Sequence, residues 1–211
     1  MRNFFDIDSF LWRWLCRLAD LMLLNLLFVL CCIPLFTIGP SLSALYTVSL
    51  KMADKEDVSV AKTFFRAFRS NFRQSLLLWL IMAGSAAVMG LNWFFLPMLP
   101  EAPEEVMKVL LNLMLLVYIA VFSYLFPVQC KFENSVANTF KNAFALAARH
   151  LLPCTLPVCA LNLAPVLLLR SGSEAAITIL TLCLWFWFSG IAFLNSKILL
   201  QIFRKYTSPR R

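Results

Sequence analysis

The chain has 211 residues, of which 61% are hydrophobic and only 14% charged, with a net charge of +8. A soluble domain carries roughly 25% charged residues, so this composition excludes a water-soluble globular protein. The longest polar insert between apolar stretches, residues 51–73, is shorter than the ~40 residues that usually fold alone. We therefore expect one integral membrane domain over residues 1–211.

Five stretches contain no Asp, Glu, Lys, Arg or His, and we call them charge-free stretches. They are residues 21–50, 74–100, 109–130, 151–169 and 175–196. Each provides about the 20 apolar residues that an α-helix needs to cross a bilayer. The sequence therefore predicts an all-α fold, a polytopic bundle of membrane helices.

The first charge-free stretch is too long for one membrane helix and too short for two of ordinary length. Gly39-Pro40 is a strong helix breaker, and Pro40 suits the first turn of a new helix. We expect one helix over residues 18–36 and a short one over residues 40–53. The short helix rises only about 21 Å at ~1.5 Å per residue, so it either crosses a thinned bilayer or re-enters on the same side.

The positions of the basic residues favour the crossing. If residues 40–53 cross, the protein has six membrane helices and both termini are cytoplasmic. Of the 19 Lys and Arg residues, only Lys108 and Arg170 then lie outside. Five helices would place Arg2, Arg13 and Arg17 outside as well. Because cytoplasmic loops collect Lys and Arg, we predict six membrane helices.

The polar insert has the pattern of an amphipathic helix. Val60, Phe64, Phe68 and Phe72 recur every four residues, and basic side chains occupy the other face. We expect this helix to lie on the inner membrane surface against anionic lipid, and it could also serve as a docking surface. The candidate docking residues are Lys62, Phe64, Arg66, Phe68, Arg69, Phe72 and Arg73.

A second segment repeats this pattern. Residues 58–76 and 134–152 are identical at nine of nineteen positions without a gap, and Lys55 matches Lys131 at the same offset. We interpret residues 55–76 and 131–152 as an internal parallel repeat, an arrangement known in membrane bundles. Convergence of two Ala- and Phe-rich amphipathic helices is the alternative.

The residues that carry chemistry are largely absent. No charge-free stretch holds a carboxylate, a histidine or a lysine. The seven cysteines form no C-x-x-C pair, and the single histidine, His150, stands alone. No nucleophile with a base and no nucleotide-binding motif is present. We expect no enzyme activity, no catalytic or metal site and no cofactor. The net charge follows from anchoring to anionic lipid, so we expect no nucleic-acid partner.

Amide and hydroxyl groups are present within the spans. Such groups hydrogen-bond between helices in lipid, which is one interpretation of them. The other is a polar cavity beside the Gly39-Pro40 break that holds a hydroxyl-rich ligand. Its candidate residues are Asn25, Gly39, Pro40, Ser41, Tyr46, Asn112 and Tyr124.

Over nearly its whole length the chain resembles the YesL family of small bacterial membrane proteins, a domain of unknown function, and the N-terminal run is the specific part. The resemblance rests on Asn3-Phe4-Phe5, on Leu11-Trp12-Arg13, on residues 17–20 and on residues 31–40. It continues through Ala44-Leu45-Tyr46 and residues 64–68. The resemblance implies a bacterial plasma-membrane protein connected with carbohydrate ABC-transporter components, without an established activity.

The predicted function is therefore an accessory or interaction subunit linked to carbohydrate uptake or its regulation. Its expected partners are the lipid bilayer and carbohydrate ABC-transporter components or a regulator. A small uncoupled permease or facilitator with a polar path near Gly39-Pro40 is the alternative. The oligomeric state stays open.

Overall fold

The computed structural model describes residues 4–98, 101–132, 134–149 and 187–207. This part of the chain forms six α-helices and two 3-10 turns, without a strand. The helices are α1 (Phe4–Cys32), α2 (Ile38–Ala53), α3 (Val60–Phe95), α4 (Glu101–Lys131), α5 (Val136–Arg149) and α8 (Trp187–Thr207), and the turns are η1 (Leu35–Thr37) and η2 (Leu96–Met98). The charge-free stretch 151–169 and the acidic loop residue Glu174 lie outside the described residues.

The break in the first charge-free stretch lies at Pro34 rather than at Gly39-Pro40. Helix α1 ends at Cys32, because the residue before a proline is pushed out of the helical conformation. The Thr37 hydroxyl donates to the carbonyl oxygens of Cys31, at 2.5 Å, and Pro34, at 2.6 Å. Helix α2 then begins at Ile38, which places Pro40 in the first turn, where its missing N–H costs nothing.

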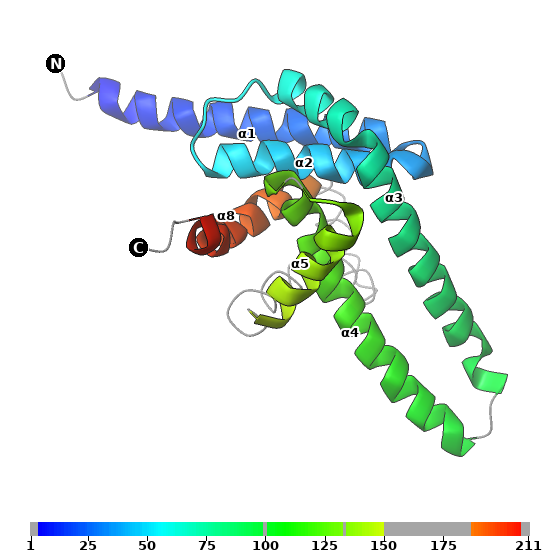
Figure 1. The fold of residues 1–211 in the computed structure, drawn as a ribbon. Coiled ribbons are helices and arrows are strands. Elements are labelled where there is room, and N and C mark those ends of the chain that lie inside the picture. The colour runs from blue at the N-terminus through cyan, green and yellow to red at the C-terminus, as the bar shows by residue number, and fades with distance from the viewer. Residues whose placement is uncertain (1–3, 99–100, 133, 150–186, 208–211) are drawn as a thin grey trace, which may run out of the picture.

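The predicted interfacial helix is the first part of α3. One uninterrupted helix runs from Val60 to Phe95, since neither Gly nor Pro occurs before Gly84. Its first part packs against α2 and α1, and its second part accompanies α4 (Figure 1). Figure 1 shows the helix turning between these two parts. The basic residues and the membrane-spanning segment thus belong to one continuous element.

Within the described part of the chain, three helical segments are long and apolar enough to cross a membrane: Leu15–Cys32, Val60–Met98 and Glu104–Lys131. The second part of α3 and most of α4 form an antiparallel pair that extends away from the other helices (Figure 1). Large apolar side chains cover this pair, such as Leu91 at 59% and Val109 at 67% exposure. Such a surface requires lipid, so the chain is a membrane protein. A bundle of six membrane helices stays a prediction.

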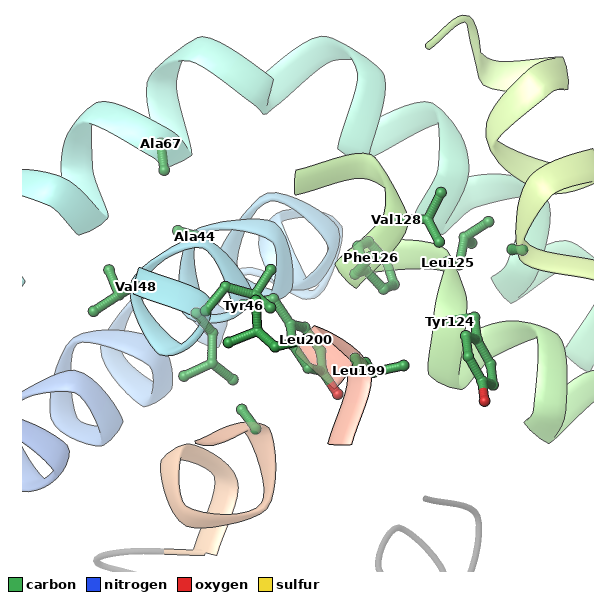
Figure 2. Close-up of a cluster of buried hydrophobic side chains, with 14 of the residues drawn as sticks. Ala44, Tyr46, Val48, Ala67, Tyr124, Leu125, Phe126, Val128, Leu199 and Leu200 are labelled. Atoms are coloured by element: carbon green, nitrogen blue, oxygen red, sulfur yellow. The ribbon is translucent and has the colours of Figure 1, made fainter. Parts of the chain in front are cut away.

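Helix α2 lies at the centre of the described helices. It contacts α1, α3, α4 and α8, and eleven of its sixteen residues are buried. Figure 2 shows this core, where Tyr46 of α2 lies near side chains of α4 and α8 such as Phe126 and Leu200. Because other helices cover α2, it does not need the length or the apolar surface of a helix that faces lipid.

Candidate functional site

Buried polar side chains surround the central helix α2, and we call them the polar centre. Each is at most 7% exposed. They comprise Asn25 of α1, Ser41, Ser43 and Ser49 of α2, Ser75 of α3, Gln129 of α4, and Ser189, Asn195 and Ser196 of α8. A membrane interior offers such groups no water, so each must find a partner within the protein. The arrangement of these partners decides whether the polar centre is packing or a ligand site.

Ser43 joins three helices. Its hydroxyl accepts a hydrogen bond from Asn71 Nδ2 of α3 at 3.1 Å. Its carbonyl oxygen accepts from Cys130 Sγ of α4 at 3.1 Å and from Thr47 Oγ1 at 2.8 Å. These bonds tie α2 to α3 and α4, which is the interhelical role that small hydroxyl and amide side chains have in lipid.

Further bonds connect the remaining helices. Asn195 Nδ2 of α8 donates to the Tyr46 hydroxyl at 3.5 Å, and the Ser189 backbone N–H donates to Asn25 Oδ1 at 3.3 Å. Gln129 Nε2 donates to Ser75 Oγ at 2.8 Å, joining α4 to α3. The polar centre therefore consists mainly of bonds between neighbouring helices.

Not every polar atom of this centre is satisfied. Five buried side-chain oxygens have no hydrogen-bond partner among the described residues: Ser41 Oγ, Ser49 Oγ, Gln129 Oε1, Asn195 Oδ1 and Ser196 Oγ. A buried polar atom without a partner costs about 1–3 kcal/mol. These oxygens are the feature of the polar centre that fits a small polar ligand or water.

The Gly39-Pro40 region is closely packed rather than hollow. A Cβ atom added to Gly39 would lie 2.5 Å from the Ser75 carbonyl oxygen and 2.5 Å from Trp79 Cβ. The backbones of α2 and α3 thus approach each other at a distance that only glycine permits. Trp79 Nε1 also donates to the Leu35 carbonyl at 3.1 Å, which holds α3 against η1.

The predicted polar cavity is assembled only in part. Asn25, Gly39, Pro40, Ser41, Tyr46 and Tyr124 are all buried among the helices. The prediction is wrong for Asn112, because this residue is exposed on the part of α4 that extends away from the core. Two cavities of the described structure open elsewhere, one between α3 and α4 and one beside α5.

The aromatic and basic faces of the first part of α3 have different environments. Lys62, Arg66, Arg69 and Arg73 are exposed, and we call this row the basic face. Phe64, by contrast, is 0% exposed. Phe68 and Phe72 are half-buried, and the three rings follow one another with centroids 6.3 and 5.6 Å apart.

Phe64 is therefore wrong as a docking residue. The amphipathic pattern predicts that its ring enters the lipid headgroups, but it lies in the protein core, since the aromatic face of α3 packs onto α2. An amphipathic pattern alone does not distinguish lipid from protein as the apolar neighbour. The four basic residues remain candidates, and within the described structure none of them has a carboxylate within salt-bridge distance.

The two copies of the proposed repeat begin in the same way. The Ser59 carbonyl oxygen accepts from the Thr63 N–H at 2.9 Å, and the Ser135 carbonyl oxygen accepts from the Thr139 N–H at 2.9 Å. Ala67 of α3 and its counterpart Ala143 of α5 are both buried. The first copy packs on α2 and the second on α4, the helix that precedes it in each case. The repeat itself stays a prediction.

Sequence reasoning missed several residues of the polar centre. Asn71, Ser75 and Gln129 all bond between helices, yet the sequence patterns did not mark them as site residues. Ser75 and Gln129 are polar residues within charge-free stretches. This position was the sequence feature that could have marked them as residues that bond between helices. Among the described residues, no three His, Cys, Asp or Glu side chains gather as potential metal ligands.

The comparisons with known proteins identify relatives of unknown function. The family described as "Protein of unknown function, DUF624" matches residues 21–93, which cover the second part of α1, all of α2 and nearly all of α3. The "Uncharacterized protein YesL" of Bacillus subtilis (strain 168) is 30% identical over 138 residues. These make up 64% of this chain and 63% of that protein, so the match spans less than two thirds of the relative. No solved structure matches the chain. The resemblance to a YesL-like family is confirmed.

Proposed function

We propose, from the premise that the chain is YesL-like, that it is a six-span protein of the bacterial plasma membrane with both termini in the cytoplasm. We further propose that it is an accessory or interaction subunit without enzyme activity of its own. The family carries no assigned activity. The site that supports this proposal best is the basic face of α3.

The exposure of the basic face is the observation that carries the proposal. Its four cations occupy about twelve residues of helix, roughly 16 Å from first to last at ~1.5 Å per residue. Phe64 anchors the opposite side of the same turns in the core, so the basic face is held in a fixed orientation. The fixed helix backbone keeps the four side chains on one surface, and Arg is among the residues that dominate binding hot spots.

The chemistry of the basic face indicates an acidic partner. Charge complementarity steers association and sets specificity, and no carboxylate neutralises these cations within the described structure. The resemblance suggests that the partner is a cytoplasm-facing component of a carbohydrate ABC transporter or its regulator. That connection with carbohydrate uptake rests on the resemblance alone and is part of the proposal.

A facilitator with a polar path near Gly39-Pro40 is the second candidate. The five unpartnered oxygens of the polar centre favour it, because they could contact a polar solute. The close approach of Gly39 to Ser75 and Trp79 argues against an open path at this point. We therefore rank it below the interaction subunit.

Charge reversal on the basic face tests the first candidate. We expect the double variant Arg66→Glu and Arg69→Glu to abolish co-purification of the partner from native membranes, since it replaces two attractive charges by repulsive ones. Abundance and membrane insertion should be unchanged, because both side chains are exposed. The measurement is quantitative mass spectrometry of proteins retained with the tagged chain.

The control reverses the same number of charges elsewhere. Lys131 and Lys141 are exposed on α4 and α5, outside the basic face. The double variant Lys131→Glu and Lys141→Glu should keep the partner. If both double variants lose it equally, the basic face is not the docking site. Saturable passage of a sugar through liposomes that contain the purified protein alone would establish the facilitator instead.

A further inference from the structure

A second surface of the molecule has the features of a ligand site. A cavity of about 340 Å³ opens beside α5, between the segment that follows α4 and the end of α8. It is lined by Phe132, Asn134, Asn142, Ala145, Leu146, Arg149 and Phe203. Its volume falls within the range of small-ligand pockets, roughly 300–1,000 Å³.

The lining of this cavity divides into an apolar and a polar part. Phe132 and Phe203 meet edge to face with their ring centroids 5.5 Å apart, and Phe203 is fully buried. Arg149, Asn142 and Asn134 contribute a cation and two amides. The described lining contains no carboxylate, and Arg149 has no ion pair among the described residues. Such a cavity suits a molecule with an anionic head and an apolar chain.

The cavity also lies where such a molecule would be found. Phe132 follows closely on the charge-free stretch 109–130, and Phe203 immediately precedes Arg204. Phe132 directly follows the span-length apolar segment Glu104–Lys131. On the proposed six-span topology, on which this step rests, the cavity lies at the level of the lipid headgroups. Basic pockets between membrane helices on the cytoplasmic side bind phospholipid headgroups in this way.

The cavity lies on the second copy of the proposed internal repeat, so its lining can be compared with the matching residues of the first copy. At the offset of 76 residues, Arg149 corresponds to Arg73 and Asn142 to Arg66. The helix face that is exposed and strongly basic in the first copy therefore lines a partly enclosed cavity with a single cation in the second copy. The proposed repeat thus places the same helix face in two different environments.

We propose that this cavity binds one anionic phospholipid, with the phosphate at Arg149 and Asn142 and an acyl chain against Phe132 and Leu146. Arg pairs with phosphate through strong charge-assisted hydrogen bonds, and the aromatic wall provides apolar contact for the chain. The cavity is separate from the basic face. A negative result for one of the two sites therefore leaves the proposal for the other unaffected.

Lipid retention by the purified full-length protein tests the proposal. Delipidated protein in detergent is titrated with phosphatidylglycerol or with phosphatidylcholine, and native mass spectrometry measures the bound fraction. We expect one phosphatidylglycerol to bind in preference to phosphatidylcholine. Arg149→Gln should weaken this binding about tenfold, since it removes a charge-assisted hydrogen bond. Lys141→Gln, on the same helix but outside the cavity, should not change it.

A second variant tests the apolar part of the cavity, and inorganic phosphate serves as a competitor for the polar part. Leu146→Trp should fill the cavity and abolish retention without changing the charge, while circular dichroism of each variant should match that of the parent protein.

Equal affinity for both lipids would overturn the proposal, as would equal losses in the Arg149 and Lys141 variants. Complete displacement of phosphatidylglycerol by inorganic phosphate would overturn the lipid as the ligand and indicate a soluble phosphate compound instead.

Discussion

The role of Gly39 in the structure differs from the role that its sequence pattern predicts. Beside Pro40 it has the pattern of a chain breaker, which predicts an irregular segment with a cavity next to it. In the structure it lies inside the first turn of α2, against the Ser75 carbonyl and the Trp79 side chain of α3. Small residues allow membrane helices to approach closely, which increases the packing contacts that hold them together in lipid.

Gly39→Ala should therefore destabilise the protein. The added methyl group would lie 2.5 Å from backbone and Cβ atoms, so α2 and α3 would have to separate. Overpacking of this kind typically costs about 1–3 kcal/mol. We expect a lower melting temperature in detergent. Gly84→Ala is the matched control, because nothing lies within 4 Å of a Cβ atom there; an equal effect in both variants would contradict the close approach.

The first part of α3 shows that one helix can serve two purposes. Its aromatic face belongs to the core, where Phe64 is 0% exposed, while its basic face is exposed on the opposite side. Asn71 adds a bond to Ser43 of α2 at 3.1 Å. The element is therefore fixed by the protein and does not depend on lipid for its position, although its basic face can still meet an acidic surface.

Adjacent phenylalanines of α3 should respond differently to the same substitution. Phe64→Ser should destabilise the fold by about 3–5 kcal/mol, the range for deleting a buried ring, whereas Phe65→Ser should be nearly neutral because Phe65 is 52% exposed. Resistance of the membrane-inserted protein to limited proteolysis measures the difference. If both variants are equally resistant, the aromatic face does not pack against α2.

At the scale of the whole molecule, α2 is the central helix, and the longer helices pack around it. It contacts α1, α3, α4 and α8, and eleven of its sixteen residues are buried. Its polar groups bond to several neighbours: the Ser43 hydroxyl accepts from Asn71, and the Ser43 carbonyl oxygen accepts from Cys130. A short polar helix is stable in the membrane when protein rather than lipid surrounds it.

The threading of the chain follows from the distribution of its basic residues. Reporter fusions at residues 5, 65, 140 and 208 should indicate the cytoplasm, and fusions at residues 103 and 172 the outside, because Lys and Arg are retained on the inner side. A cytoplasmic signal at residue 65 together with an outside signal at residue 5 would show that residues 40–53 do not cross. The five-helix arrangement would then replace the six-helix one.

Much of the helical structure was predictable from the sequence because it depends on local patterns. The short helix before Ala53 and the helices over the charge-free stretches 74–100 and 109–130 appear close to their predicted positions. The predicted position of the first break was wrong, because Pro34 competes with Gly39-Pro40 and only the Thr37 bonds to Cys31 and Pro34 make the earlier turn stable. For Asn112, the error was to treat every amide in a span as buried.

The sequence by itself determined that this protein belongs in lipid, that it is helical and that it resembles the YesL family, because these follow from composition, from the length of apolar runs and from local motifs. Only the tertiary structure decided which neighbour each face has. It directed the aromatic face of α3 onto α2, closed the Gly39 region and left Arg149 beside an open cavity. These outcomes depend on contacts between residues far apart in the chain, and periodicity along one helix carries no information about which partner covers it.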